Sequence, residues 1–363
     1  MKILNVKTPD GDYNILIHHG LLLKVGELVS ERWKKRKIAL ISDDNVAPLY
    51  MADVKKQLEA HDFKVFTFVV PHGEQSKCLA ELAKIIKGMA HDRFNRSDGV
   101  IALGGGVVGD LAGFVSATYM RGIDLIQIPT SFLAQVDSSV GGKTAIDLDD
   151  VKNLIGSFHQ PDLVIIDPND LKTLPKRDLV EGYGETLKVA ALNGGAFWKF
   201  VQKVNQPSDL LKYASQLIEF AIKFKAIVVS HDEKESGERQ ILNLGHTIGH
   251  GVEALAHGKL RHGEAVSIGL VAICRIFESH QLSLKGMTDQ IKHRLSVVGL
   301  PIHSKLVASP HLIDKIKNDK KNRDGYMNVI YLKDFGHPVI KALSISQINQ
   351  SIQGLVKAHP DVY

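Results

Sequence analysis

The stretch "LGGGVVGDLAGFVSATYM", residues 103–120, decides the fold class of this chain. Gly104, Gly106 and Gly109 match the pattern G-x-G-x-x-G, directly after a strand-like run and directly before a helical pattern. In that context, backbone N–H groups and the helix N-terminus can hold a pyrophosphate group. The stretch therefore predicts a βαβ unit that binds a dinucleotide. The alternative is that the glycines serve only close packing of the helix on the strand.

The stretch departs from the usual dinucleotide fingerprint in two respects. Two predicted strands precede it, and no carboxylate closes the next strand about 20 residues later. An acid that binds the ribose must then come from elsewhere. Asp43 directly follows the strand-like run "KIALIS", residues 37–42. Because ligands of open α/β sheets gather at the carboxyl ends of the strands, Asp43 is the candidate.

Strand-like and helical patterns alternate on both sides of this stretch. The strand-like runs cover residues 37–42, 64–70, 99–105, 124–129 and 162–167. This alternation predicts an α/β domain with a mostly parallel, Rossmann-like sheet covered by helices. From residue 178 onward the pattern changes to long helical segments, apart from the strand-like "MNVIYL" near residue 330. We therefore expect an α/β NAD-binding domain over 1–177, a mainly α-helical domain over 178–363, and an active site in the interdomain cleft.

Composition and charge restrict the class of protein. The 363 residues exceed the size of about 250–300 residues at which single cores stop growing. No run reaches the roughly 18 apolar residues of a membrane span, and the amino terminus lacks a signal-peptide pattern, so we expect a cytoplasmic protein with no membrane partner. Two cysteines are too few for a disulfide framework. The net charge of +5 could suit an anionic small molecule as easily as nucleic acid, but the basic runs carry almost no aromatic residues, so base stacking is not indicated and we expect no nucleic-acid partner.

A second glycine-rich stretch, "VDSSVGGKTAID" (136–147), resembles the end of a phosphate-binding P-loop. The leading glycine of G-x-x-x-x-G-K-[ST] is missing, because position 137 is Asp. This departure argues against an ATPase. Lys143 and Asp137 remain as a cation and a carboxylate that suit an anionic, hydroxylated substrate.

Histidines and one carboxylate predict a metal site in the helical domain. In "LNLGHTIGH" (242–250), His246 and His250 are four residues apart and would share one face of a helix. Catalytic zinc sites commonly use three protein ligands, and spacing alone favours His246 and His250 with His262 or Glu185 as the third. Because the chain has 17 histidines, two ordinary histidines at helical spacing remain an alternative. No H-E-x-x-H pattern is present, which argues against a metalloprotease.

Taken together, the motifs resemble those of the 3-dehydroquinate synthases, which are sugar-phosphate cyclases related to iron-type alcohol and glycerol dehydrogenases. The resemblance runs through nearly the whole chain. The motifs that carry it are, in order, "PHGEQSK", "ALGGGVVGDLAGFVSATYMRG", "IPTSFLAQVDSSVGGKTAID", "KNLIGSFHQP", "EGYGETLK", "LNLGHTIGHGVE", "LRHGEAV" and "DKK". It implies an amino-terminal α/β nucleotide-binding domain and a carboxy-terminal helical domain.

The resemblance also implies roles for individual residues. It implies Zn²⁺ or Co²⁺ bound by Glu185, His246 and His262, with His250 left facing the substrate. The positions implied for NAD are Asp43, Glu74, Lys77, Gly105, Gly106, Val107, Asp110, Thr130, Ser131, Leu133, Lys143, Lys152, Thr173 and Leu174. Those implied for substrate binding are Arg121, Lys143, Asn153, Lys225 and either Lys320 or Lys321 of the "DKK" motif. Those implied for catalysis are Asp137, Lys188, Arg239, Asn243 and His250.

The activity that the resemblance implies is a cyclising phosphate lyase of the shikimate pathway, which leads to chorismate and the aromatic amino acids. It would convert 3-deoxy-D-arabino-heptulosonate 7-phosphate to 3-dehydroquinate and phosphate. The expected steps are a transient oxidation by NAD, phosphate elimination, re-reduction and an intramolecular aldol closure. The resemblance further suggests a homodimer.

Two other activities remain as alternatives. One is a 2-epi-5-epi-valiolone or 2-deoxy-scyllo-inosose synthase, but Arg239 would have little purpose in a site for a sugar without a carboxylate. The other is a glycerol-dehydrogenase-like oxidoreductase, which the many cations suited to phosphate and carboxylate disfavour.

Overall fold

The computed structural model describes residues 1–9, 11–149, 151–317 and 325–363. The chain forms two compact units. The first comprises Met1–Leu174 together with Lys225–Lys234, and the second comprises Pro175–Phe224 together with Glu235–Tyr363. Helix α8 (Ala214–His231) therefore contributes residues to both units.

A seven-stranded sheet forms the centre of the first unit, in the order β1-β2-β9-β6-β5-β3-β4. Every neighbouring pair is parallel except β1 and β2. The predicted mostly parallel sheet is thereby confirmed, and the antiparallel β1–β2 pair is an addition at one edge. The strands are β1 (Lys2–Val6), β2 (Tyr13–Ile17), β3 (Lys37–Asp43), β4 (Lys64–Val70), β5 (Gly99–Gly104), β6 (Asp124–Pro129) and β9 (Leu163–Ile166).

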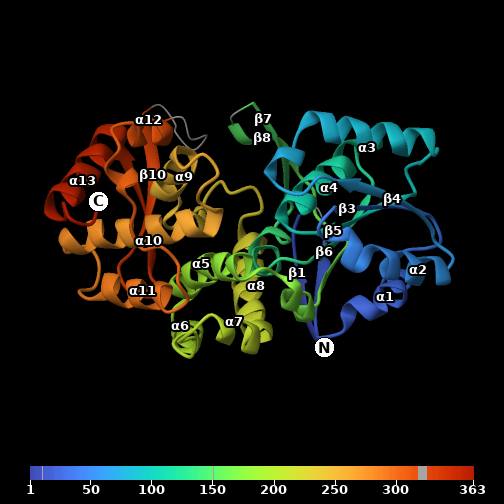
Figure 1. The fold of residues 1–363 in the computed structure, drawn as a ribbon, viewed down its shortest axis with the longest axis horizontal. Coiled ribbons are helices and arrows are strands. Elements are labelled where there is room, and N and C mark those ends of the chain that lie inside the picture. The colour runs from blue at the N-terminus through green and yellow to red at the C-terminus, as the bar shows by residue number, and fades with distance from the viewer. Residues whose placement is uncertain (10, 150, 318–324) are drawn as a thin grey trace. The chain divides into compact units, whose positions relative to one another are not determined.

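Helices cover both faces of this sheet (Figure 1). Alternation along β3 separates the two cores, because successive side chains of a strand point to opposite faces. Leu40 packs in the core formed with α1 and α2, whereas Ala39 and Ile41 pack in the core formed with α3 and α4. The helices are α1 (Val25–Arg32), α2 (Ala52–Ala60), α3 (Leu79–His91) and α4 (Gly106–Thr118).

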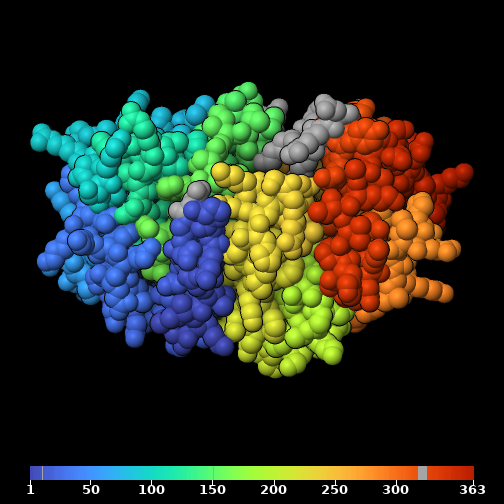
Figure 2. Space-filling model, turned by 180° about the vertical axis from the view of Figure 1, so that it is seen from behind, coloured from blue at the N-terminus to red at the C-terminus, as the bar shows by residue number. Residues whose placement is uncertain are grey.

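Two further parts complete the first unit. Strands β7 (Lys143–Leu148) and β8 (Val151–Phe158) form a separate antiparallel hairpin. The last turns of α8 lie beside the amino-terminal strands, as Figure 2 shows in yellow and dark blue. The Lys7 N–H donates to Ser230 Oγ at 3.3 Å across this contact.

The second unit is mainly α-helical, as predicted. Helix α10 is buried along most of its length and packs against α5, α9 and α11 (Figure 1). The elements are α5 (Lys176–Asn193), α6 (Gly195–Val201), α7 (Ser208–Lys212), α9 (His246–Leu255), α10 (His262–Ser279), α11 (Met287–Ser296), α12 (Leu312–Lys317) and α13 (Ile345–Ala358), with the hairpin β10 (Tyr326–Leu332) and β11 (Pro338–Ser344). Within the described parts of the chain, no helix combines the length and apolar character that crossing a bilayer requires.

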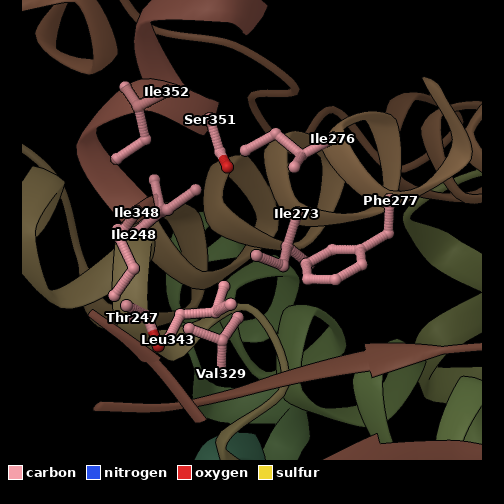
Figure 3. Close-up of a pocket in the computed structure, with 10 residues that line it drawn as sticks. All are labelled: Thr247, Ile248, Ile273, Ile276, Phe277, Val329, Leu343, Ile348, Ser351 and Ile352. Atoms are coloured by element: carbon pink, nitrogen blue, oxygen red, sulfur yellow. The ribbon is translucent and has the colours of Figure 1, made fainter. Parts of the chain in front are cut away.

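A small apolar cavity of about 20 Å³ lies inside the second unit (Figure 3). Thr247 and Ile248 of α9 line it, together with side chains of α10, α13 and the β10–β11 hairpin. Such a lining offers few partners for water, so we expect the cavity to be dry. It belongs to the core that supports α9 next to His246.

Candidate active site

Three helices of the second unit bring together the candidate metal ligands. Glu185 lies in α5, His246 begins α9 and His262 begins α10. Glu185 Oε1 lies 3.5 Å from the Nε2 atom of His246 and 3.5 Å from that of His262. These distances are too long for strong hydrogen bonds. They are close to the roughly 3.3 Å that separates two ligands of a tetrahedral metal with bonds of about 2.0–2.1 Å. The three side chains therefore fit a shared divalent cation.

The electrostatics of this cluster also favour a cation. Burial by itself lowers the pKa of His262, but the neighbouring carboxylates of Glu185 and Glu253 outweigh burial and raise the pKa to about 10. The field that favours an imidazolium ion would equally favour a bound metal ion. The Glu185 side chain is only 1% exposed, so solvent screens this field little.

His250 lies next to the same cluster. Its ring centroid is 5.0 Å from that of His246 and 5.7 Å from that of His262. Among the residues that the structure describes, one ring nitrogen from each of the three histidines lies within 4.8 Å of the others. The structure thus brings together all four side chains that the sequence nominated for the metal site. Glu185 is distinguished by one oxygen at equal distance from two of the imidazoles.

Glycines next to the candidate ligands allow their helices to approach closely. A side-chain carbon at Gly184 would lie 2.5 Å from the carbonyl oxygen of Gly263, and one at Gly263 would overlap the carbonyl oxygen of Glu181. A side-chain carbon at Gly269 of α10 would similarly overlap the carbonyl oxygen of Gly245, which precedes His246. The spacing of α5, α9 and α10, and with it the geometry of the cluster, therefore requires glycine.

We expect Gly263→Ala to destabilise the protein and weaken metal binding together. The added methyl group must push α10 away from α5, which costs about 1–3 kcal/mol or more. The same shift separates His262 from Glu185. The control is Gly354→Ala in α13, where an added carbon meets no atom within 4 Å. It should stabilise the helix by about 0.5–1 kcal/mol. Denaturant unfolding would measure the stability of both variants, and metal titration would measure their metal affinity. Equal stability and equal metal affinity in the two variants would contradict the prediction.

Lys188 and Asn243 contact acidic side chains in the second unit. Lys188 Nζ lies 2.5 Å from Glu185 Oε2 and donates to the Leu242 carbonyl at 2.7 Å. By holding Oε2, Lys188 leaves Oε1 directed at the two imidazoles. Asn243 Nδ2 donates to Glu235 Oε1 at 2.5 Å. The sequence reasoning did not nominate Glu235, although the acid-rich "HDEKE" stretch was a signal for it.

Arg239 is almost completely buried. Its side chain is 1% exposed, and it lies in the 3-10 helix η7 (Glu238–Asn243) that directly precedes the candidate ligand segment. This position suits the anion-binding role that the sequence predicts for Arg239.

Lys77 lies at the centre of a buried ion cluster in the first unit. Its Nζ lies 2.9 Å from Asp110 Oδ2 and 3.2 Å from Glu74 Oε1. Asp147 Oδ1 is the third acceptor, at 3.9 Å. Burial lowers the pKa of Lys77, but the charges of Asp110 and Glu74 outweigh burial and raise it. The sequence nominated Glu74, Lys77 and Asp110 for NAD but missed Asp147, which strand β7 brings to the cluster.

The glycine stretch forms the predicted strand–turn–helix. Strand β5 ends at Gly104, and α4 begins at Gly106. A side-chain carbon at Gly106 would lie 2.9 Å from Ser138 Oγ, so the loop packs closely against the segment after β6. Asp43 ends β3, where its Oδ1 accepts the N–H groups of Asn45 and Val46, both at 2.9 Å.

The other positions predicted for NAD lie in several elements of the first unit. Most follow the carboxyl ends of the parallel strands, where ligands of such sheets bind. Val107 lies in α4, Thr130, Ser131 and Leu133 follow β6, Lys152 lies in β8, and Thr173 and Leu174 follow β9.

The positions predicted for the substrate in the first unit include one close pair. Lys225 Nζ donates to Asp137 Oδ1 at 2.7 Å and to the Asp137 carbonyl at 2.8 Å. Arg121, Lys143 and Asn153 lie in η4 (Tyr119–Arg121), β7 and β8, respectively. Arg121 and Asn153 have positive φ values, 73° and 53°. Lys320 and Lys321 lie outside the described residues.

Asp170 is a buried acid that the sequence did not nominate. It lies in the 3-10 helix Pro168–Thr173 that follows β9 and is 3% exposed, and its Oδ2 has no hydrogen-bond partner among the described residues. Burial, and secondarily the charge of Asp167, raises its pKa from the ordinary value of 3.8 to about 8. The folded protein therefore holds a proton here that the unfolded chain loses above about pH 4.

We expect Asp170 to lower the stability of the protein as the pH rises from about 4 to about 8. The unfolded chain releases this proton at about pH 4, whereas the folded protein holds it up to about pH 8, so folding binds a proton over this range. The slope from this group is at most about 1.4 kcal/mol per pH unit. Asp170→Asn stays neutral and should remove this component, so the variant gains stability relative to the wild type as the pH rises. Urea unfolding at pH 5 and pH 8 would measure the difference. A wild-type slope retained in the variant would contradict the assignment.

Comparison with known proteins shows the family to which the chain belongs. The family described as 3-dehydroquinate synthase N-terminal matches residues 67–181, and the family described as 3-dehydroquinate synthase C-terminal matches residues 182–322. The chain belongs to the 3-dehydroquinate synthase family. It is 49% identical to the 3-dehydroquinate synthase of Latilactobacillus sakei, over 97% of this chain and 98% of that protein. It is 47% identical to that of Leuconostoc mesenteroides, over 96% of this chain and 98% of that protein.

Solved structures of other proteins share the fold of this chain. A 2-deoxy-scyllo-inosose synthase complexed with carbaglucose-6-phosphate, NAD⁺ and Co²⁺ matches with a TM-score of 0.88 and 24% identity, over 97% of this chain and 100% of that one. A 2-epi-5-epi-valiolone synthase from Streptomyces hygroscopicus with NAD⁺ and Zn²⁺ bound matches with a TM-score of 0.85 and 23% identity, over 99% and 100%.

These comparisons confirm the resemblance that the motifs predicted. They support 3-dehydroquinate synthase activity, and they do not favour the two alternatives. A probable glycerol dehydrogenase from Sinorhizobium meliloti shares the fold with a TM-score of 0.62 and 16% identity, over 96% of this chain and 98% of that one.

Proposed function

We propose that this member of the 3-dehydroquinate synthase family converts 3-deoxy-D-arabino-heptulosonate 7-phosphate to 3-dehydroquinate and phosphate, and that it requires NAD and a divalent metal ion, Zn²⁺ or Co²⁺. The observation that carries the proposal is the carboxylate oxygen of Glu185 at 3.5 Å from the Nε2 atoms of both His246 and His262, in a chain of this family. The proposal includes the setting that the resemblance implies, a cytoplasmic homodimer.

The proposed metal ligands are Glu185, His246 and His262. The bound metal would supply Lewis acidity that lowers the pKa of a substrate hydroxyl group. The chain orients the ligands through its own contacts. Lys188 holds Glu185 Oε2 at 2.5 Å, and the Leu244 carbonyl accepts from His246 Nδ1 at 3.1 Å. These contacts fix the side chains before the metal and substrate arrive, which is the preorganisation that catalysis needs.

The proposed NAD site lies in the first unit, and bound NAD would supply transient redox chemistry there. Lys77, held by Glu74 and Asp110, supplies a fixed positive charge beside the glycine loop. The amino terminus of α4 at Gly106 offers backbone N–H groups to the pyrophosphate. The remaining positions proposed for NAD are Asp43, Gly105, Val107, Thr130, Ser131, Leu133, Lys143, Lys152, Thr173 and Leu174.

The proposed substrate carries a carboxylate and a phosphate, so its site needs several cations. Arg239 and Lys225 are buried cations that bind anions well once water is excluded. Further proposed contacts come from Arg121, Lys143, Asn153 and Lys320 or Lys321. Several of the chain's basic residues are thus proposed to bind the carboxylate and the phosphate of one anionic substrate.

Proton transfer is proposed for side chains near the metal and near the substrate. His250 neighbours both metal-ligand imidazoles, and Lys188 contacts Glu185. Asp137, which accepts from Lys225, supplies a carboxylate. Asn243, which donates to Glu235, is proposed for hydrogen bonding to the substrate rather than for proton transfer. Each of these groups can donate or accept a hydrogen bond at a reacting hydroxyl group, directly or through water.

The deciding experiment follows three products in one reaction. Protein stripped with a chelator is given the heptulosonate phosphate, NAD and either Zn²⁺ or Co²⁺, while phosphate, dehydroquinate and NADH are measured. We expect equal amounts of phosphate and dehydroquinate, dependence on both metal and NAD, and no accumulated NADH. Steady NADH without phosphate would instead indicate an alcohol dehydrogenase. Phosphate released only from a sugar phosphate without a carboxylate would indicate another cyclase.

A further inference from the structure

Glu253 contacts one of the proposed metal ligands from a neighbouring helix. Its Oε2 lies 3.0 Å from Nδ1 of His262, and its side chain is 11% exposed. Glu253 lies in α9, seven residues after His246, and therefore two turns farther along the same face of that helix. Helix α9 thus supplies His246 itself and also a carboxylate that touches the ligand from α10.

The contact determines which ring nitrogen of His262 can bind a metal. An ionised carboxylate only accepts hydrogen bonds, so Nδ1 of the neutral ring must carry the proton. The lone pair then lies on Nε2, the atom that is 3.5 Å from Glu185 Oε1. His246 has the same arrangement, because its Nδ1 lies 3.1 Å from the Leu244 carbonyl oxygen. Both rings therefore present Nε2 to the same carboxylate oxygen.

We propose that Glu253 is a positioning residue of the metal site, which fixes the tautomer and the ring orientation of His262 by accepting the Nδ1 hydrogen bond. This inference rests on the proposed ligand set of Glu185, His246 and His262. Partners of this kind raise the basicity of a ligand histidine and hold its ring, and their loss typically costs 10–100-fold in metal affinity. Glu253 itself does not touch the metal or the substrate in this arrangement.

A purely structural role for Glu253 makes a different prediction. In that case the carboxylate would only stabilise the connection between α9 and α10, and its removal would lower the stability of the protein without changing the metal. Glu278 provides a matched control at the other end of α10. Its carboxylate accepts from the backbone N–H groups of Gly286 and Thr288, at 2.5 and 2.9 Å, and no proposed ligand is among these partners.

The test compares Glu253→Ala, Glu253→Gln and Glu278→Ala in the full-length protein. Metal affinity is measured by competition with a chelator, the ligand field by the visible spectrum of the Co²⁺ form, and stability by thermal unfolding of the metal-free form. We expect Glu253→Ala to lose 10–100-fold in affinity and to shift the Co²⁺ bands. Glu253→Gln should recover most of that loss, because its amide oxygen can still accept from Nδ1. Glu278→Ala should lose stability but keep the affinity and spectrum of the wild type.

Two results would overturn the inference. One is Glu253→Ala with wild-type affinity and spectrum. The other is Glu253→Gln that loses as much affinity as Glu253→Ala, because the charge rather than the hydrogen bond would then matter. If Glu253→Ala fails to fold, Glu253→Met takes its place, because methionine fills a similar space but its side chain offers no oxygen to accept from Nδ1, and wild-type affinity and spectrum in that variant would overturn the inference. Glu185→Gln is measured in parallel, because unchanged metal binding in that variant would contradict the ligand set itself rather than the role of Glu253.

Discussion

Replacing Glu185 with glutamine is expected to abolish metal binding and, with it, catalysis. Glu185 Oε1 lies 3.5 Å from the Nε2 atoms of His246 and His262. Glu185 is also the negatively charged member of the proposed ligand set, so its charge would attract a divalent cation. Loss of a contact to a ligand already costs about 10–100-fold in affinity, so loss of the ligand should exceed about 100-fold. We expect turnover to fall by roughly 1000-fold or more, since metal Lewis acidity contributes several kcal/mol. Metal titration and steady-state turnover of the variant would measure both effects.

A second substitution separates lost metal binding from lost folding. Lys188 is 2% exposed and pairs with Glu185. The single variant Glu185→Gln therefore leaves the buried ammonium group of Lys188 without its carboxylate partner, which lowers the stability of the protein. In the double variant Glu185→Gln/Lys188→Met, that charge is gone, and the stability of the metal-free protein should recover. Metal binding should remain lost. If the single variant still binds metal with wild-type affinity, Glu185 is not a ligand.

Replacing Lys77 with methionine is expected to destabilise the first unit strongly and to weaken NAD binding. Three carboxylates, those of Glu74, Asp110 and Asp147, would remain around the position of a cation whose side chain is only 5% exposed. Removing one partner of a buried ionic group typically costs about 3–5 kcal/mol. Loss of the charge beside the glycine loop should also reduce NAD affinity about tenfold or more. Urea unfolding and calorimetric titration with NAD would measure the two effects.

The pH dependence of the Lys77→Met variant gives an independent check. Without the cation, the pKa values of the three carboxyl groups must rise, so the folded variant binds protons more tightly than the unfolded chain does. The defect in stability should therefore shrink as the pH falls from 8 to about 5. The control is Lys84→Met, which removes an exposed lysine that pairs with Glu81 at 3.2 Å. Its effect should stay within about 1 kcal/mol. Equal costs for the two lysines would contradict the assigned role of Lys77.

The sheet could be predicted where its strands are buried on both faces. Strands β3, β5, β6 and β9 are short apolar runs, which is typical of parallel strands covered by helices. Strands β1, β2, β7, β8 and β11 were not predicted. Strand β2 pairs with β9, whose first residue, Leu163, aligns with Asn14. A pairing across so many residues leaves no local pattern in the sequence, because each strand is stabilised by a partner that only the folded chain supplies.

Local spacing in the sequence predicted how the two histidines of α9 lie, but it could not predict which residues of other helices lie beside them. The four-residue interval predicted that His246 and His250 share a face of α9, and their ring centroids lie 5.0 Å apart. The same reasoning named Glu185 and His262 only as alternatives for a third ligand, because they lie on α5 and α10 and no local interval relates them to His246. It also missed Glu253, because the partner of that residue is His262 in another helix.

The order of motifs along the chain was therefore enough to determine the family, the parallel α/β sheet, the helical second part and the residue types available for chemistry. These depend on local patterns of apolar residues and glycines, which short stretches of sequence carry in full. The tertiary structure alone decided which side chains meet. The close approach of α5, α9 and α10 at their glycines sets one Glu185 oxygen at equal distance from two imidazoles, and the packing of β7 adds Asp147 to the charges around Lys77. Such distances arise from packing between elements far apart in sequence, where no local pattern records them.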